Sequence, residues 1–182
     1  METINGKNFT RRNFILSSGL ASTGIMLGAT ALLTSCKTHS KNRAILDRYY
    51  TALQHKNADE LRSAIEEGFS TDAVLRISDS LPYGGTHSGR QVILTMLMGF
   101  VTTTTPIIRP EQIKIERIVE EGDSIVAKAV FPWLAPGAST PIQMSAFEWF
   151  TFRNGRVSEM VVSYWDTAAC VAAMKAVEQN NK

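Results

Sequence analysis

Glu148 is the residue whose setting best suits proton transfer. It belongs to a run in which alternate residues are apolar, namely Met144, Ala146, Phe150 and Phe152. A strand here points the carboxylate where these apolar side chains point. Removal from water raises the pKa of a carboxyl group and suits it to exchange a proton near neutral pH. Two other interpretations stay open: a twist or bulge of the strand turns Glu148 outward, or an arginine pairs with it.

Asp166 and His87 are two further acid–base candidates. Asp166 follows a strand-like run and precedes a helical run, so it either lines a pocket or caps the helix. His87 stands in a loop that contains glycines, and histidine titrates near neutral pH without help from its surroundings. This side chain lies either at the mouth of a pocket or in a solvated turn.

The Asn154-Gly155 turn decides whether Glu148 and Asp166 share one face of the sheet. A two-residue loop pairs Phe152 with Val157 and puts the two acids on opposite faces. A three-residue loop with a bulge puts them on the same face. The sequence leaves both registers open.

Three tyrosines, Tyr49, Tyr50 and Tyr83, carry hydroxyls that can donate a hydrogen bond to a ligand oxygen. For Tyr49 and Tyr50, which fit one helix, the alternative is ordinary core packing with a wet hydroxyl. No His or Cys pair has the spacing of metal ligands. The sequence also has no phosphate loop, dinucleotide fingerprint or nucleophile elbow, so we expect neither a metal nor a cofactor.

Residues 1–36 predict export. Arg11-Arg12 precede an apolar stretch, which ends in Leu33-Thr34-Ser35-Cys36. This order resembles a twin-arginine export signal joined to a lipoprotein cleavage box. The resemblance implies that Cys36 is lipidated and holds the chain at a membrane outside the cytoplasm. The alternative is an uncleaved transmembrane helix, which needs about 20 residues.

The charge balance excludes a nucleic-acid-binding protein. The formal net charge is +2, and the leader accounts for this excess, so the rest of the chain is close to neutral. It contains no basic block of the kind that follows a phosphate backbone. With Cys36 lipidated, Cys170 has no partner for an internal disulfide and is predicted to be a small buried apolar residue.

After a tether over residues 37–42, residues 43–182 suffice for one domain with its own core. Apolar spacing predicts helices over 44–55, 58–68 after an Asn57 cap, about 89–100 after a Ser88 cap, and 167–178. Alternation predicts strands over 69–77, 107–119, 124–133, 142–152 and 157–165. Helices followed by a meander predict an α+β fold: one strongly curved antiparallel sheet covered on its concave side by the N-terminal helices.

Two short motifs carry a resemblance to a known family. Pro82-Tyr83-Gly84-Gly85, with Gly89-Arg90 after it, opens a predicted helix, and Phe-x-Phe-x-Asn-Gly-Arg156 forms the predicted hairpin. Behind a helix pair, this order resembles the SnoaL-like branch of the nuclear transport factor 2-like superfamily, from about Ala44 to Met174. The resemblance implies a cystatin-like α+β roll with a cone-shaped, mainly apolar pocket. It also implies an acid at the place of Glu148 and a pocket position for an Asp near the end of the chain.

The superfamily includes cyclases, isomerases, hydrolases, dehydratases and members without a reaction, so the fold assigns no activity. Our first hypothesis is an exported, lipid-anchored domain that binds a small, largely apolar molecule, with isomerase- or cyclase-type proton transfer by Glu148 or Asp166. A pocket of at least about 300 Å³ beside either acid favours it. The alternative is a non-catalytic binding or interaction module. Phe147, Trp149 and Thr151 alternate on the face opposite Glu148, as the interface of a homodimer requires.

Overall fold

The computed structural model describes residues 40–104 and 106–180, which belong to one compact unit. The predicted export signal and Cys36 lie outside the described residues. Among the helices of the described part, none combines the length and the apolar character needed to cross a membrane.

Two capped helices open the domain. α1 (Lys41–Gln54) begins at Ser40, whose hydroxyl accepts a hydrogen bond from an amide of the first turn at 3.0 Å. α2 (Ala58–Gly68) is capped by Asn57, as predicted: the Asn57 side chain accepts a hydrogen bond of 3.1 Å from the amide of Glu60. These bonds satisfy amides that a helix leaves without a partner at its start.

Six strands form one sheet in the order β2-β1-β6-β5-β4-β3. The strands are β1 (Phe69–Ile77), β2 (Gly85–Ser88), β3 (Lys114–Glu121), β4 (Ser124–Trp133), β5 (Ile142–Arg153) and β6 (Arg156–Tyr164). The other elements are α3 (Arg90–Thr102), the 3₁₀ helix η1 (Pro110–Gln112) and α4 (Thr167–Asn180). β1 runs parallel to β6, whereas all other neighbours are antiparallel. The predicted α+β class with one curved sheet is confirmed, and the parallel pair is an addition to it.

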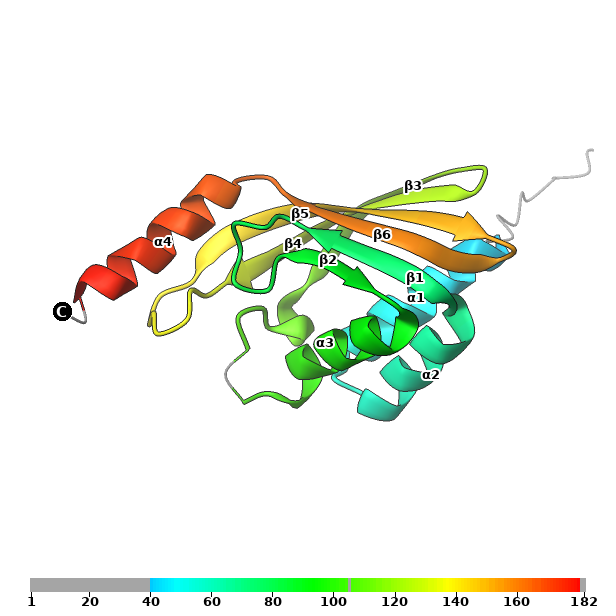
Figure 1. Cartoon of the computed structure of the whole chain (residues 1–182), viewed down its shortest axis with the longest axis horizontal. Helices are drawn as coiled ribbons and strands as arrows, with labels where there is room; N and C mark the ends of the chain where they lie inside the picture. The colour runs from blue at the N-terminus through cyan, green and yellow to red at the C-terminus, as the bar shows by residue number, and fades with distance from the viewer. Residues whose placement is uncertain (1–39, 105, 181–182) are drawn as a thin grey trace, which may run out of the picture. The chain divides into compact units, whose positions relative to one another are not determined.

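α1, α2 and α3 lie together against one face of the sheet, and α4 leaves the end of β6 and points away from them (Figure 1). Between the three helices and the sheet lies the core. Its largest fully buried side chains include Trp133, Tyr49, Phe69, Phe150 and Leu46. Cys170 is buried and unpaired, in agreement with its predicted role as a small apolar residue.

Three local predictions are wrong. Residues 85–88, predicted as a loop, form β2 against β1. Ser88 belongs to that strand and does not cap α3; the N-cap is Gly89, whose φ of 94° favours glycine. The strand predicted over 107–119 begins only at Lys114, because η1 occupies the residues before it.

The β5–β6 turn combines features of both registers that the sequence left open. Asn154 and Gly155 have positive φ values of 54° and 69°, as a two-residue type I′ turn requires. Phe152 pairs with Val157 across this turn. The ladder resumes beyond Ser158, which is therefore an extra residue in β6, a β-bulge.

This bulge sets which side chains of β6 share a face with Glu148. Beyond it, Glu148 lies opposite Val162, and Ala146 lies opposite Tyr164. Directly opposed residues of an antiparallel pair point to the same face. Val162 and Tyr164 therefore point toward the helices together with Glu148.

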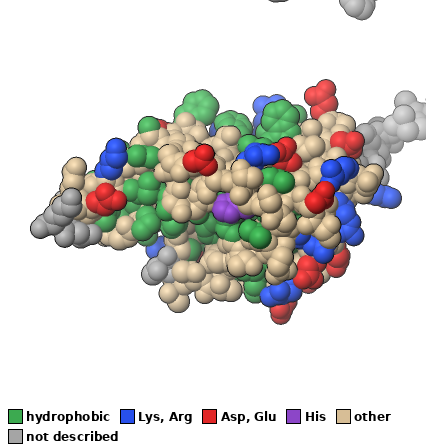
Figure 2. Space-filling view, viewed as in Figure 1, with side chains coloured by type: hydrophobic (Ala, Val, Ile, Leu, Met, Phe, Trp, Pro, Cys, Tyr) green, Lys and Arg blue, Asp and Glu red, His purple; other side chains and the backbone are tan. Residues whose placement is uncertain are grey.

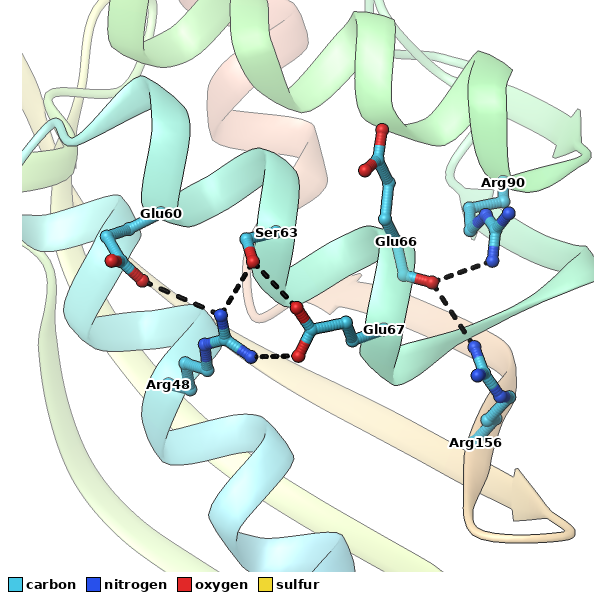
Figure 3. A network of polar contacts seen from close by, with 7 residues as sticks. All are labelled: Arg48, Glu60, Ser63, Glu66, Glu67, Arg90 and Arg156. Atoms are coloured by element: carbon cyan, nitrogen blue, oxygen red, sulfur yellow. Dashed lines mark hydrogen bonds and ion pairs between the residues drawn. The ribbon is translucent and has the colours of Figure 1, made fainter.

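Arg90 and Arg156, one from each motif of the family resemblance, hold the C-terminal end of α2 (Figure 3). Both guanidinium groups donate to the carbonyl oxygen of Glu66, at 2.7 Å and 3.2 Å. Both also reach the carbonyl oxygen of Phe69, at 3.3 Å and 3.4 Å. The last carbonyls of a helix have no partner within it and carry partial negative charge. The two arginines therefore serve the fold, because they join α3 and the β5–β6 turn to α2.

Candidate functional site

A cavity lies between the helices and the covered face of the sheet. Its volume is about 50 Å³, room for about three to five waters at the roughly 10–15 Å³ that each occupies. This is below the about 300 Å³ expected of a ligand site. Its polar lining groups are Glu148, Tyr49, Tyr83 and Tyr164, and all its other lining residues are apolar.

Glu148 comes from the middle of β5, with buried apolar neighbours on the same face of the strand. Its Oε2 accepts a hydrogen bond of 2.6 Å from the hydroxyl of Tyr50 on α1. The side chain is half-buried by area, and the small cavity that it lines is walled mainly by apolar side chains, so little bulk water reaches the carboxyl group. Burial raises the pKa of Glu148 from 4.5 to about 7, although the bond from Tyr50 acts in the opposite direction.

Tyr49 and Tyr50 follow one another on α1 and are related to Glu148 in different ways. Tyr49 lines the cavity, and its ring packs near Phe69 and Phe150 with centroid distances of 6.1 Å to both. Tyr50 is not on the cavity wall and binds the carboxyl group from α1. Burial, and then the charge of Glu148, raises the pKa of both phenols well above the ordinary value, so both stay protonated.

Beside the cavity, hydrogen bonds join three side chains in a row, those of Trp133, Tyr83 and Tyr164. Nε1 of Trp133 on β4 donates to the hydroxyl of Tyr83 at 2.7 Å, and that hydroxyl donates to the hydroxyl of Tyr164 at 2.8 Å. Phe100 and Phe131 hold the two phenol rings edge-on, at centroid distances of 6.1 Å from Tyr83 and 5.7 Å from Tyr164. Burial raises the pKa of Tyr83 to about 12 and that of Tyr164 well above its ordinary value.

The structure does not bring Asp166 or His87 to the cavity. Asp166 is exposed, and its Oδ1 accepts a hydrogen bond of 2.8 Å from the amide of Ala169 in the first turn of α4. It is therefore an N-cap, one of the two roles that the sequence left open. His87 lies in β2, where its Nε2 is 3.1 Å from the carbonyl oxygen of Tyr83.

Tyr164 and Trp133 are site residues that the sequence reasoning missed. Alternation along β6 was the available signal for Tyr164, because it shares parity with Met160 and Val162. The site thus joins one carboxyl group of raised pKa to protonated phenols inside an apolar wall, an arrangement that supports proton transfer. Within residues 40–104 and 106–180, no cluster of His, Cys, Asp or Glu side chains is arranged to hold a metal ion.

Comparison with known proteins identifies the fold family. The sequence model of the SnoaL-like domain matches residues 46–160. Bal32a, from a soil-derived mobile gene cassette, has a TM-score of 0.60 and 18% identity, over 74% of this chain and 96% of that chain. An NTF2-like protein of unknown function from Burkholderia pseudomallei has a TM-score of 0.59 and 18% identity, over 75% and 98%. TerC, co-crystallised with polyporic acid, has a TM-score of 0.60 and 19% identity, over 75% and 99%.

At these sequence identities the similarity to solved structures shows the fold but does not assign an activity. No curated protein matches the chain. The predicted likeness to SnoaL-like and nuclear transport factor 2-like domains is confirmed by the family match and by these neighbours.

Proposed function

The chain belongs to the SnoaL-like family, and from that premise we propose that its cavity binds a small, largely apolar molecule on which Glu148 moves a proton. The observation that carries the proposal is the setting of this carboxyl group. It lies in an apolar cavity with one hydrogen bond, from Tyr50. Its pKa of about 7 lets it act as a base and as an acid at neutral pH.

The reaction class is proton abstraction next to a carbonyl group. Oε2 of Glu148 is held by Tyr50, which leaves Oε1 to face the ligand. The C–H bond breaks, its electron pair moves to form an enolate, and Oε1 takes the proton. Return of that proton to another carbon isomerises the ligand. Attack of the enolate carbon on a second carbonyl group instead closes a ring: the C–C bond forms as the C=O π bond breaks, and Glu148 returns its proton to the alkoxide oxygen.

Ligand size sets a condition on the proposal. A cavity of about 50 Å³ must widen for a molecule of more than a few heavy atoms. Met96 and Phe100 of α3 line it and are only half-buried, and an unbranched Met side chain changes rotamer readily. The likeness of the fold to TerC, which was co-crystallised with polyporic acid, supports a small molecule as occupant.

The test is exchange of α-protons of small cyclic ketones in D₂O, followed by ¹H NMR. We expect the protein to accelerate exchange at neutral pH and Glu148→Gln to abolish the acceleration while the ketone still binds. Glu121→Gln, at an exposed position of β3, is the control and retains full activity. Equal exchange with Glu148→Gln and the unmodified protein would remove Glu148 from the mechanism.

A second candidate function is pairing of two copies through the uncovered face of the sheet. Trp149 and Phe147 of β5 are 53% and 37% exposed, and Val119 of β3 is 50% exposed. Hydrophobic side chains are visible at the surface along the top of Figure 2, on the side of the sheet away from α1–α3. Exposed aromatic residues on one sheet face suit an isologous interface.

Analytical ultracentrifugation tests this pairing. A dimer that Trp149→Glu converts to a monomer supports it. Val92→Glu replaces a 49% exposed residue of α3 and keeps the dimer. A protein that is monomeric before any substitution contradicts pairing through this face.

We also propose that the chain is exported and anchored through a lipidated Cys36. Arg11-Arg12, the apolar stretch and the Leu33–Cys36 box in the sequence support this location. Replacement of Cys36 by Ser is expected to prevent incorporation of labelled fatty acid and to release the protein from membranes. Label on the Cys36→Ser protein contradicts the assignment.

A further inference from the structure

The hydrogen bonds from Trp133 through Tyr83 to Tyr164 run in one direction. An indole N–H only donates, so the Tyr83 hydroxyl must accept from Nε1 of Trp133. That hydroxyl then directs its own hydrogen at the Tyr164 oxygen. Tyr164 is the acceptor at the end of the chain, and its hydroxyl hydrogen has no acceptor among the described residues.

Tyr164 is also placed to use that hydrogen. It lines the same cavity as Glu148, and the two side chains point to the same face of neighbouring strands. The charge of Glu148 contributes to the raised pKa of Tyr164, as expected for two groups that face one small cavity. A hydroxyl that already accepts a hydrogen bond is polarised and becomes a stronger donor.

We propose that Tyr164 donates a hydrogen bond to a ligand oxygen while Glu148 faces an acidic C–H of the same ligand. The ligand class is then an apolar carbonyl compound that can form an enolate. This inference rests on the proposed function, because it assigns the second polar contact of that site. Tyr83 and Trp133 are positioning residues, since they act by orienting and polarising the Tyr164 hydroxyl.

The chain of hydrogen bonds also explains why Tyr83, one of the three tyrosines that the sequence offered as donors, does not fill that role. Its one hydroxyl hydrogen is used on Tyr164. Tyr50 is occupied in the same way by Glu148. Tyr49 lines the cavity without a hydrogen bond among the described residues, so it is the rival donor that an experiment must separate from Tyr164.

Cyclohexanone and methylenecyclohexane are the probes, because they differ only in an oxygen replaced by a CH₂ group. Their affinities are measured with the full chain by NMR, from the methyl signals of Met96 and Met160 in the cavity wall. The ratio of the two affinities isolates the contact to the oxygen. We expect Tyr164→Phe to lower the preference for cyclohexanone about threefold to tenfold, the effect of one neutral hydrogen bond. Ser163→Ala, on the opposite face of β6, leaves the ratio unchanged.

The possible outcomes separate this inference from the proposed function. An unchanged ratio in Tyr164→Phe, or a drop only in Tyr49→Phe, overturns the role of Tyr164. If α-proton exchange of cyclohexanone is lost in Glu148→Gln all the same, the proposed function stands without it. If the ratio falls in Tyr164→Phe but the protein accelerates no exchange, Tyr164 is a binding donor and the proton transfer fails. If neither compound binds, both assignments fail.

Discussion

Replacement of Glu148 by Gln should change how the stability of the protein depends on pH. The pKa of Glu148 is raised from 4.5 to about 7 in the folded state. Between these pH values the folded protein therefore holds more protons than the unfolded chain. The free energy of unfolding then falls as pH rises from about 4.5 to about 7 and levels off above that range. Glutamine keeps the shape and accepts from Tyr50 but does not titrate.

The size of this effect follows from the difference between the two pKa values. At 1.36 kcal/mol for each pKa unit, ionised Glu148 destabilises the folded state by about 3 kcal/mol above pH 7. For a domain of this size, that difference corresponds to roughly 6–12 °C in Tm. The Glu148→Gln protein is expected to gain this much stability relative to the unmodified protein between pH 4.5 and pH 8.

Urea unfolding of both proteins at pH 4.5, 6, 7 and 8 measures the difference directly. Glu121→Gln, at an exposed position of β3, should follow the unmodified protein at every pH. The reasoning is refuted if the difference between Glu148→Gln and the unmodified protein is the same at pH 4.5 and pH 8. That result would mean that the carboxyl group is not desolvated in the folded state.

Three further predictions test the structure around the site. Tyr50→Phe removes the hydrogen bond that lowers the pKa of Glu148. A ¹³C NMR titration of this variant should therefore place the pKa of Glu148 above 7. Arg90→Ala and Arg156→Ala should each lower the free energy of unfolding by about 0.5–1 kcal/mol. The double variant should lower it by about 2–3 kcal/mol, because only this variant leaves the shared carbonyl oxygens at the end of α2 without a donor. Urea unfolding of the two single variants and the double variant measures this coupling. Gly84→Ala should lower the free energy of unfolding by about 3 kcal/mol or prevent folding, since its Cβ would lie 1.9 Å from a backbone oxygen. Gly155→Ala places its Cβ in open space at φ 69°, so the same measurement should show a loss of only about 1 kcal/mol.

Much of the fold is predictable because periodicity reports which face of an element is buried. β4 is predicted with its observed bounds, Ser124–Trp133, since its alternate residues are strictly buried in the structure. β1 is likewise found over Phe69–Ile77. β2 was missed because a strand of four residues is too short to show a period, and its pairing with β1 joins residues that are 8 to 14 positions apart in the sequence.

The candidate site was predictable only in part. Glu148 stands out in the sequence as a carboxylate among apolar residues, and that signal is local. Tyr164 does not stand out in this way, because its neighbours Tyr83 and Trp133 come from distant parts of the chain. Asp166 satisfies two local patterns at once, and only the three-dimensional path after β6 selects the helix cap.

One extra residue in β6 determines the composition of the site. Val157 points inward opposite Phe152, so regular alternation from there would also turn Glu159, Val161 and Ser163 inward and expose Tyr164. Ser158 breaks this alternation, and its hydroxyl donates to the carbonyl oxygen of Thr151 across the hairpin at 3.1 Å.

The turn before the bulge is fixed from outside the sheet, because Arg156 is hydrogen-bonded to the end of α2. A residue of the hairpin motif that does not line the cavity therefore helps to hold the register that brings Tyr164 to the cavity of Glu148. This coupling explains how the motif can be structural while the site depends on it.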